Sequence, residues 1–129
     1  MIERPRTNEQ QQGRRRRVFK KRRKTSDIFV FYEEFEHDAN ADDIDALHRS
    51  RGGLCNGFHY IVRKDGAVEQ GRDELDYGWH TPGRNGDTLA VCFIVPPGGE
   101  LTKMQVDHPL ITTLRVKYPR ANVVYPDER

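Results

Sequence analysis

The sequence predicts an α/β domain in which a central mixed β-sheet is flanked by helices, behind a basic N-terminal arm. Two apolar runs, residues 27–32 and 88–95, are typical of strands buried on both faces. Between them, the Asp-Gly pair at 65–66 separates two shorter extended segments and is a strong hairpin signal. Helical patterns occur at residues 41–51 and within 102–118, so strands and helices alternate along the chain.

Charge divides the chain into an arm, residues 1–24, and a domain, residues 25–129. Residues 1–26 hold 8 Arg and 3 Lys against two Glu, a net charge of +9; the whole chain carries +2, so the remainder carries −7. The polar, aperiodic composition predicts an arm that is disordered when free. It is either a solvated tail or a polyanion-binding segment that contacts phosphates. The candidate polyanion-binding residues are Arg14, Arg15, Arg16, Arg17, Lys20, Lys21, Arg22, Arg23 and Lys24.

The first strand and first helix follow the arm. Residues 27–32 are apolar nearly throughout, and an acidic loop follows them. Asn40 is a suitable N-cap, and acidic residues in the next turn complement the helix dipole, so a helix is expected over 41–51. The glycine pair at 52–53 ends this helix.

The later elements are bounded by turn residues. The hairpin strands are expected at 58–63 and 67–71, and residues 73–87 form an irregular surface segment. In the last third, Pro109 lies either in the first turn of a helix capped near His108 or at a kink. A short strand is expected at 122–125.

Several classes of protein are disfavoured by composition. No apolar run approaches the length of a membrane span, and the N-terminal residues lack the apolar core of a secretory signal. Cys55 and Cys92 are the two cysteines and lie far apart, which favours a reduced, cytosolic state over a disulfide.

A series of short motifs connects the chain to a known family. They are Arg-Val-Phe-Lys-Lys-Arg at 17–22, Ile-Phe-Val at 28–30, Gly-Phe-His-Tyr-Ile-Val-Arg-Lys-Asp-Gly at 57–66, Gly-Arg-Asp-Glu at 71–74, Gly-Trp-His at 78–80, Arg-Asn at 84–85 and Lys-Tyr at 117–118. In this order, over about residues 17–125, the chain resembles the zinc-dependent N-acetylmuramoyl-L-alanine amidases, and among them the short phage lysozymes. The resemblance implies the fold of type-2 amidases and peptidoglycan recognition proteins.

The resemblance also implies a zinc site, for which this sequence lacks the expected ligands. In the family, two His and a Cys or an Asp-type carboxylate hold the ion, with one position open to water or substrate. The first ligand position is Phe31, the second falls on Asp127 or Glu128, and the third lies beyond the last residue. A tyrosine that assists catalysis in many members is Phe58 here. We therefore expect no zinc or other cofactor, no metal ligands and no catalytic residues.

From these differences the sequence predicts a catalytically inactive phage protein of the amidase fold that acts by binding. It would be a virion component or a regulator that binds a viral or host protein, or nucleic acid through the arm, in the host cytoplasm or the virion. One alternative is an active peptidoglycan-degrading endolysin with rearranged metal ligands, for which His37, His80 and Asp127 are conceivable donors. Another is a non-catalytic peptidoglycan-binding protein. The candidate residues of the ligand cleft are Phe31, Phe58, Arg72, Trp79, His80, Arg84 and Asn85.

Overall fold

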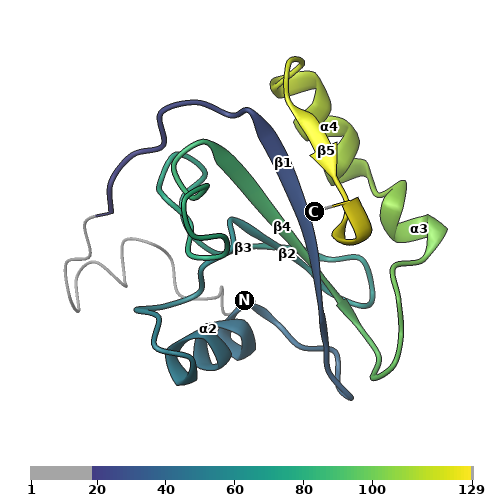
Figure 1. Cartoon of the computed structure of the whole chain (residues 1–129). Helices are drawn as coiled ribbons and strands as arrows, with labels where there is room; N and C mark the ends of the chain where they lie inside the picture. The colour runs from purple at the N-terminus through teal and green to yellow at the C-terminus, as the bar shows by residue number, and fades with distance from the viewer. Residues whose placement is uncertain (1–18, 129) are drawn as a thin grey trace, which may run out of the picture.

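The computed structural model describes residues 19–128 and shows a five-stranded sheet with helices on both of its faces (Figure 1). The predicted polyanion-binding residues Arg14 to Arg17 lie outside the described residues. In chain order the elements are β1 (Asp27–Glu34), α2 (Ala41–Ser50), β2 (Tyr60–Val62), β3 (Val68–Gln70), β4 (Thr88–Val95), α3 (Lys103–Val106), α4 (Pro109–Lys117), β5 (Asn122–Val124) and the short 3-10 helix η1 (Pro126–Glu128).

The sheet is mixed, as the sequence predicts, in the order β3-β2-β4-β1-β5. The pairs β1–β4, β2–β4 and β1–β5 are parallel, and the β2–β3 hairpin supplies the antiparallel edge. The two long apolar strands β1 and β4 are therefore central. Every residue of β4 is buried, because helices cover both faces of the sheet at this strand.

The alternation of side chains along the strands divides the core into two layers. Ile28 and Val30 of β1 pack with Leu114 of α4 on one face. On the other face, Cys92 of β4 packs with Ile44 of α2. This second face also carries Phe31 and Phe58, so the positions expected to form the site lie on the face of the sheet that α2 covers.

The helix boundaries follow the caps that the sequence contains. The Asn40 side chain accepts the backbone N–H of Asp43, and the Asp43 side chain accepts that of Asn40, which forms a capping box at the start of α2. In the last third, the predicted helical region is two helices, α3 and α4. His108 caps α4 by accepting the N–H of Leu110, with Pro109 in the first turn.

The last basic residues before β1 lie against the loop that follows β3. The backbone N–H of Arg22 donates to Leu75 O at 2.7 Å, and that of Arg23 donates to Gly86 O at 2.7 Å. Lys21 forms an ion pair with Asp76 at 2.6 Å. The expected boundary between arm and domain at residue 24 stays a prediction.

None of the helices formed by residues 19–128 has both the length and the apolar character needed to cross a bilayer.

Candidate functional site

Three of the predicted residues meet beside strand β1. The ring of Phe31 lies 5.1 Å from that of Phe58 and 5.4 Å from the imidazole of His80, measured between centroids. Phe58 is 3% exposed, whereas Phe31 and His80 are half-buried. Trp79 joins the group through His48, whose ring lies 5.3 Å from the indole and 4.8 Å from Phe58. These five residues are called the aromatic cluster below.

The close approach of two loops places Trp79 in the cluster. The backbone N–H of Trp79 donates to Gly57 O at 2.9 Å. A Cβ atom at Gly57 would collide with the carbonyl group of Trp79, so this approach requires glycine. The indole is 36% exposed and forms the solvent-facing edge of the cluster. An exposed indole on an aromatic wall can stack on the C–H face of a sugar ring or on a peptide.

The loop that carries His80 is held by Asn85. The Asn85 Oδ1 atom accepts the backbone N–H groups of His80 and Thr81, each at 3.0 Å. The His80 Nδ1 atom lies 3.0 Å from the Thr81 hydroxyl. Asn85 therefore positions the His80 loop and is a supporting residue of the site.

His48, on α2, is a supporting residue as well. It is 3% exposed, and its Nδ1 atom accepts the backbone N–H of Gly57 at 2.7 Å. Burial, with Arg51 and Arg72 nearby, lowers the pKa of His48 to about 4. The imidazole is therefore neutral at pH 7, which suits its role as a hydrogen-bond acceptor.

Two predicted cleft residues make contacts that hold the fold together. The Arg72 guanidinium donates to Asn56 O at 3.0 Å and to Tyr77 O at 2.9 Å, and it lies 4.0 Å from the centroid of the Phe19 ring. Arg84 forms ion pairs with Asp27 at 2.5 Å and with Asp87 at 3.1 Å.

Arg72 is 7% exposed, and its guanidinium joins two loops close to His48. Arg84 lies at the margin of the cluster, because its guanidinium is 5.2 Å from the ring of Phe29, which itself lies 6.3 Å from the imidazole of His80.

His59 is the last residue of the Gly-Phe-His motif, directly precedes β2 and is fully buried. Its Nδ1 accepts the N–H of Ala90 at 3.0 Å, and its Nε2 lies 2.7 Å from Asp76 O. Burial lowers the pKa of His59 to about 4, although the hydrogen bond to Asp76 opposes this. Both ring nitrogens are thus used to join β4 to the loop after β3.

A network around the Glu74 carboxylate lies on the other side of the sheet. Glu74 was not among the predicted residues of the ligand cleft. Glu74 accepts hydrogen bonds from the hydroxyl groups of Tyr60, at 2.5 Å, and Tyr118, and it forms an ion pair with Lys117 at 2.7 Å. Burial alone would raise the pKa of Glu74, but the bonds from Lys117, Tyr118 and Tyr60 outweigh burial and lower it. The three partners come from two segments far from Glu74 in the sequence, at position 60 and at positions 117–118, so no local pattern indicated the network.

The zinc site implied by the resemblance does not fit the described residues. Phe31 and Phe58 have no donor atoms, and His80 is their neighbour with imidazole nitrogens. Within residues 19–128, no three His, Cys, Asp or Glu side chains are grouped so that they could hold a metal ion. His37 instead lies 3.1 Å from Asp43 at the start of α2, so the conceivable set of His37, His80 and Asp127 is not assembled.

Comparisons with known proteins agree with this fold. The chain is 34% identical over 113 residues to the endolysin of Escherichia phage T7, an alignment that covers 80% of this chain and 75% of that protein. It superposes on the N-acetylmuramoyl-L-alanine amidase LysC from Clostridium intestinale URNW with a TM-score of 0.70 and 26% identity, covering 81% of this chain and 72% of that one. No family model matches the chain.

A third comparison bears on the fold alone. The peptidoglycan recognition protein PGRP-Hd from Alvinella pompejana superposes with a TM-score of 0.68 at 18% identity, covering 84% of this chain and 77% of that one. The chain therefore belongs to the phage endolysin family of N-acetylmuramoyl-L-alanine amidases, with the fold shared by these amidases and peptidoglycan recognition proteins. This is a family of enzymes.

These findings correct the expectation of an inactive protein that acts only by binding. The curated relatives are named endolysins, and the superposed LysC structure is an amidase, so the comparisons favour the peptidoglycan-degrading alternative. Phenylalanine at positions 31 and 58 excludes metal binding by these two side chains, but it does not exclude activity that rests on other residues.

Proposed function

We propose that this protein is a peptidoglycan-degrading endolysin that hydrolyses the amide bond between N-acetylmuramic acid and L-alanine. In this proposal the reacting groups are side chains other than the metal ligands of the family pattern. The observation that carries the proposal is the 34% identity over 113 residues to a phage endolysin. The aromatic cluster supports it, because it lies where the resemblance places the reacting centre.

The aromatic cluster supplies the binding surface in this proposal. Trp79 at the exposed edge contacts a sugar ring or stem peptide, while Phe31 and Phe58 form an apolar wall behind it. Peptidoglycan offers both kinds of surface, since its sugars have apolar C–H faces and its stem peptides carry small apolar side chains. Binding energy from these contacts would hold the scissile amide beside His80.

His80 is the proton-transferring candidate of the cluster. The centroid of its ring lies 5.4 Å from that of Phe31. Its backbone N–H donates to Asn85 Oδ1, which holds the loop in place. An imidazole can take a proton from an attacking water and return one to the leaving amine near neutral pH. In the family pattern zinc would polarise the carbonyl as a Lewis acid, but residues 19–128 do not form a site for it.

The proposal is tested by turnover of purified, insoluble peptidoglycan, with the appearance of new L-alanine amino termini as the readout. The full chain is expected to release peptides, and His80→Gln to lower the rate by at least about tenfold. The matched control is His37→Gln, because His37 is exposed and lies at the start of α2. Equal rates for His80→Gln and the native protein would remove His80 from the mechanism.

A binding measurement separates substrate recognition from chemistry. Trp79→Ala is expected to reduce retention on insoluble peptidoglycan, because it removes the exposed aromatic edge of the cluster. Val116→Ala is the control, since Val116 is also exposed but lies on α4, a helix that packs on the other face of the sheet. Retention unaffected by Trp79→Ala would show that the cluster is not the binding surface.

A further inference from the structure

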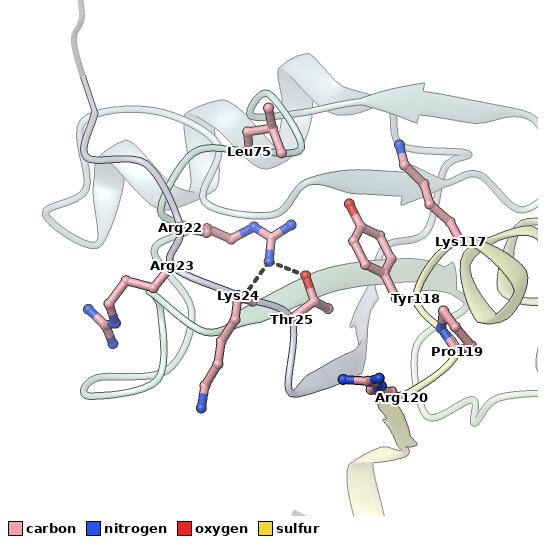
Figure 2. A pocket seen from close by; sticks show the side chains of 9 residues that line it. All are labelled: Arg22, Arg23, Lys24, Thr25, Leu75, Lys117, Tyr118, Pro119 and Arg120. Atoms are coloured by element: carbon pink, nitrogen blue, oxygen red, sulfur yellow. Dashed lines mark hydrogen bonds between the residues drawn. The ribbon is translucent and has the colours of Figure 1, made fainter.

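A basic cavity lies between the segment before β1 and the end of α4, away from the aromatic cluster (Figure 2). It has a volume of about 390 Å³. Its walls come from residues 22–25 on one side and 117–120 on the other, with Leu75 from the loop after β3. The lining residues are Arg22, Arg23, Lys24, Thr25, Leu75, Lys117, Tyr118, Pro119 and Arg120.

The charge of this cavity has one sign. Five of its lining side chains are cationic, and no carboxylate is among the lining residues. The side chains of Lys24 and Arg120 make no hydrogen bond or ion pair with any residue between 19 and 128, and both are exposed. Unpaired cations around a concave site raise the local concentration of anions.

Other contacts fix the shape of the cavity. The Arg22 guanidinium donates to Glu74 O at 2.7 Å, to Lys24 O at 3.0 Å and to the Thr25 hydroxyl at 2.6 Å. Lys117 is held by its ion pair with Glu74. The wall is therefore formed before any ligand arrives, which reduces the ordering cost of binding.

Apolar groups complete the site. The ring of Tyr118, the ring of Pro119 and the side chain of Leu75 lie among the cations. A bare phosphate would use only the charged groups, whereas a nucleotide carries both a phosphate and a planar base. Aromatic side chains within a cationic groove are the pattern by which proteins bind single-stranded nucleic acid.

We propose that this cavity binds one nucleotide unit of a single-stranded nucleic acid, with Lys24 and Arg120 on the phosphate and the Tyr118–Pro119 wall against the base. The site is independent of the proposed amidase function, because it shares no residue with the aromatic cluster.

The test measures binding of a fluorescently labelled dT10 oligonucleotide to the full chain by anisotropy at several salt concentrations. The double variant Lys24→Gln/Arg120→Gln is expected to bind at least about fivefold more weakly than the native protein. Its slope of log affinity against log salt should fall by about 0.7, since the two side chains neutralise one phosphate and each neutralised phosphate of a single strand contributes about 0.7.

The matched control is Lys103→Gln/Arg115→Gln, which removes the same charge from exposed residues outside the cavity. It is expected to bind within about twofold of the native protein. Equal affinity for the native protein and the cavity variant, or an equal loss in the control, would overturn the proposal. Cavity-dependent binding to phosphatidylglycerol vesicles without binding to dT10 would overturn it too, because the occupant would then be a lipid headgroup.

Discussion

The rings of Phe31 and Phe58 lie 5.1 Å apart at an interplanar angle of 42°, on the face of the sheet that α2 covers. Phe31 lies in the middle of β1, and Phe58 lies just before β2. Because β1 and β2 flank β4, the two rings come from segments on either side of β4. In the family pattern these two positions carry a metal ligand and an assisting tyrosine. Here the two rings form an apolar wall beside His80.

The wall also contributes to stability. Phe58→Ala is expected to lower the free energy of unfolding by about 3–5 kcal/mol, because it removes a ring that is 3% exposed and contacts both Phe31 and His48. Phe58→Leu, which keeps most of the volume, should lose less than about 1.5 kcal/mol. Denaturant unfolding of the three proteins measures the difference, and similar stabilities for all of them would contradict the packing described here.

Asn85 is expected to matter for activity through the His80 loop. Asn85→Ala removes the acceptor for two backbone N–H groups and should lower stability by about 1–3 kcal/mol. It should also lower peptidoglycan turnover under conditions in which the variant is folded, because His80 is then less well positioned. Asn85→Asp keeps a side-chain oxygen at the same place and should retain more activity; if the two variants lose activity equally, the oxygen is not what positions the loop.

Stability should depend on pH through His59 and His48. Both have a folded pKa of about 4, below the usual value of 6.5, so the unfolded chain binds more protons between these values. Stability is therefore full above about pH 6.5 and falls as the pH is lowered toward 4. For the fully buried His59 the loss is on the order of 3 kcal/mol. Unfolding free energies at a series of pH values measure it, and a flat profile between pH 7 and 4.5 would contradict the burial of neutral imidazoles.

The Glu74 network makes a second contribution to the pH dependence of stability, at lower pH than the two histidines. Because its pKa is lowered below the usual 4.5, Glu74 stabilises the fold above that pH and loses this effect as the pH falls further. Glu74→Gln keeps the shape but removes the charge that Lys117 and the two tyrosine hydroxyls contact, and should destabilise the protein by about 1–3 kcal/mol. Glu100→Gln is the control, because Glu100 is exposed. Equal stability of the two variants would show that the network contributes nothing.

Local sequence signals were sufficient for most of the fold. The cap at Asn40 and the proline at 109 set the starts of α2 and α4, and the apolar runs became β1 and β4. The strand predicted at 58–63 is shorter in the structure, since β2 begins at Tyr60. The reason is local, because the N–H of Phe58 donates to the side chain of Asn56 and not to a neighbouring strand.

The site was only partly predictable, because its contacts join distant segments. The family motifs indicated that Phe31, Phe58 and His80 come together, and the structure confirms that they do. No sequence pattern could show that Arg72 binds the carbonyl groups of two loops. Nor could it show that Arg120 and Lys24 line the same cavity, since 96 positions separate them and the parallel pairing of β5 with β1 brings their segments together.

The expected locations, host cytoplasm or virion, and protein partners stay predictions. The proposed amidase activity is tested most directly by mass spectrometry of purified peptidoglycan after incubation with this chain. We expect stem peptides that begin with a free L-alanine amine, together with glycan strands from which those peptides have been removed. Undigested peptidoglycan, or fragments produced only by cleavage between sugars, would contradict it.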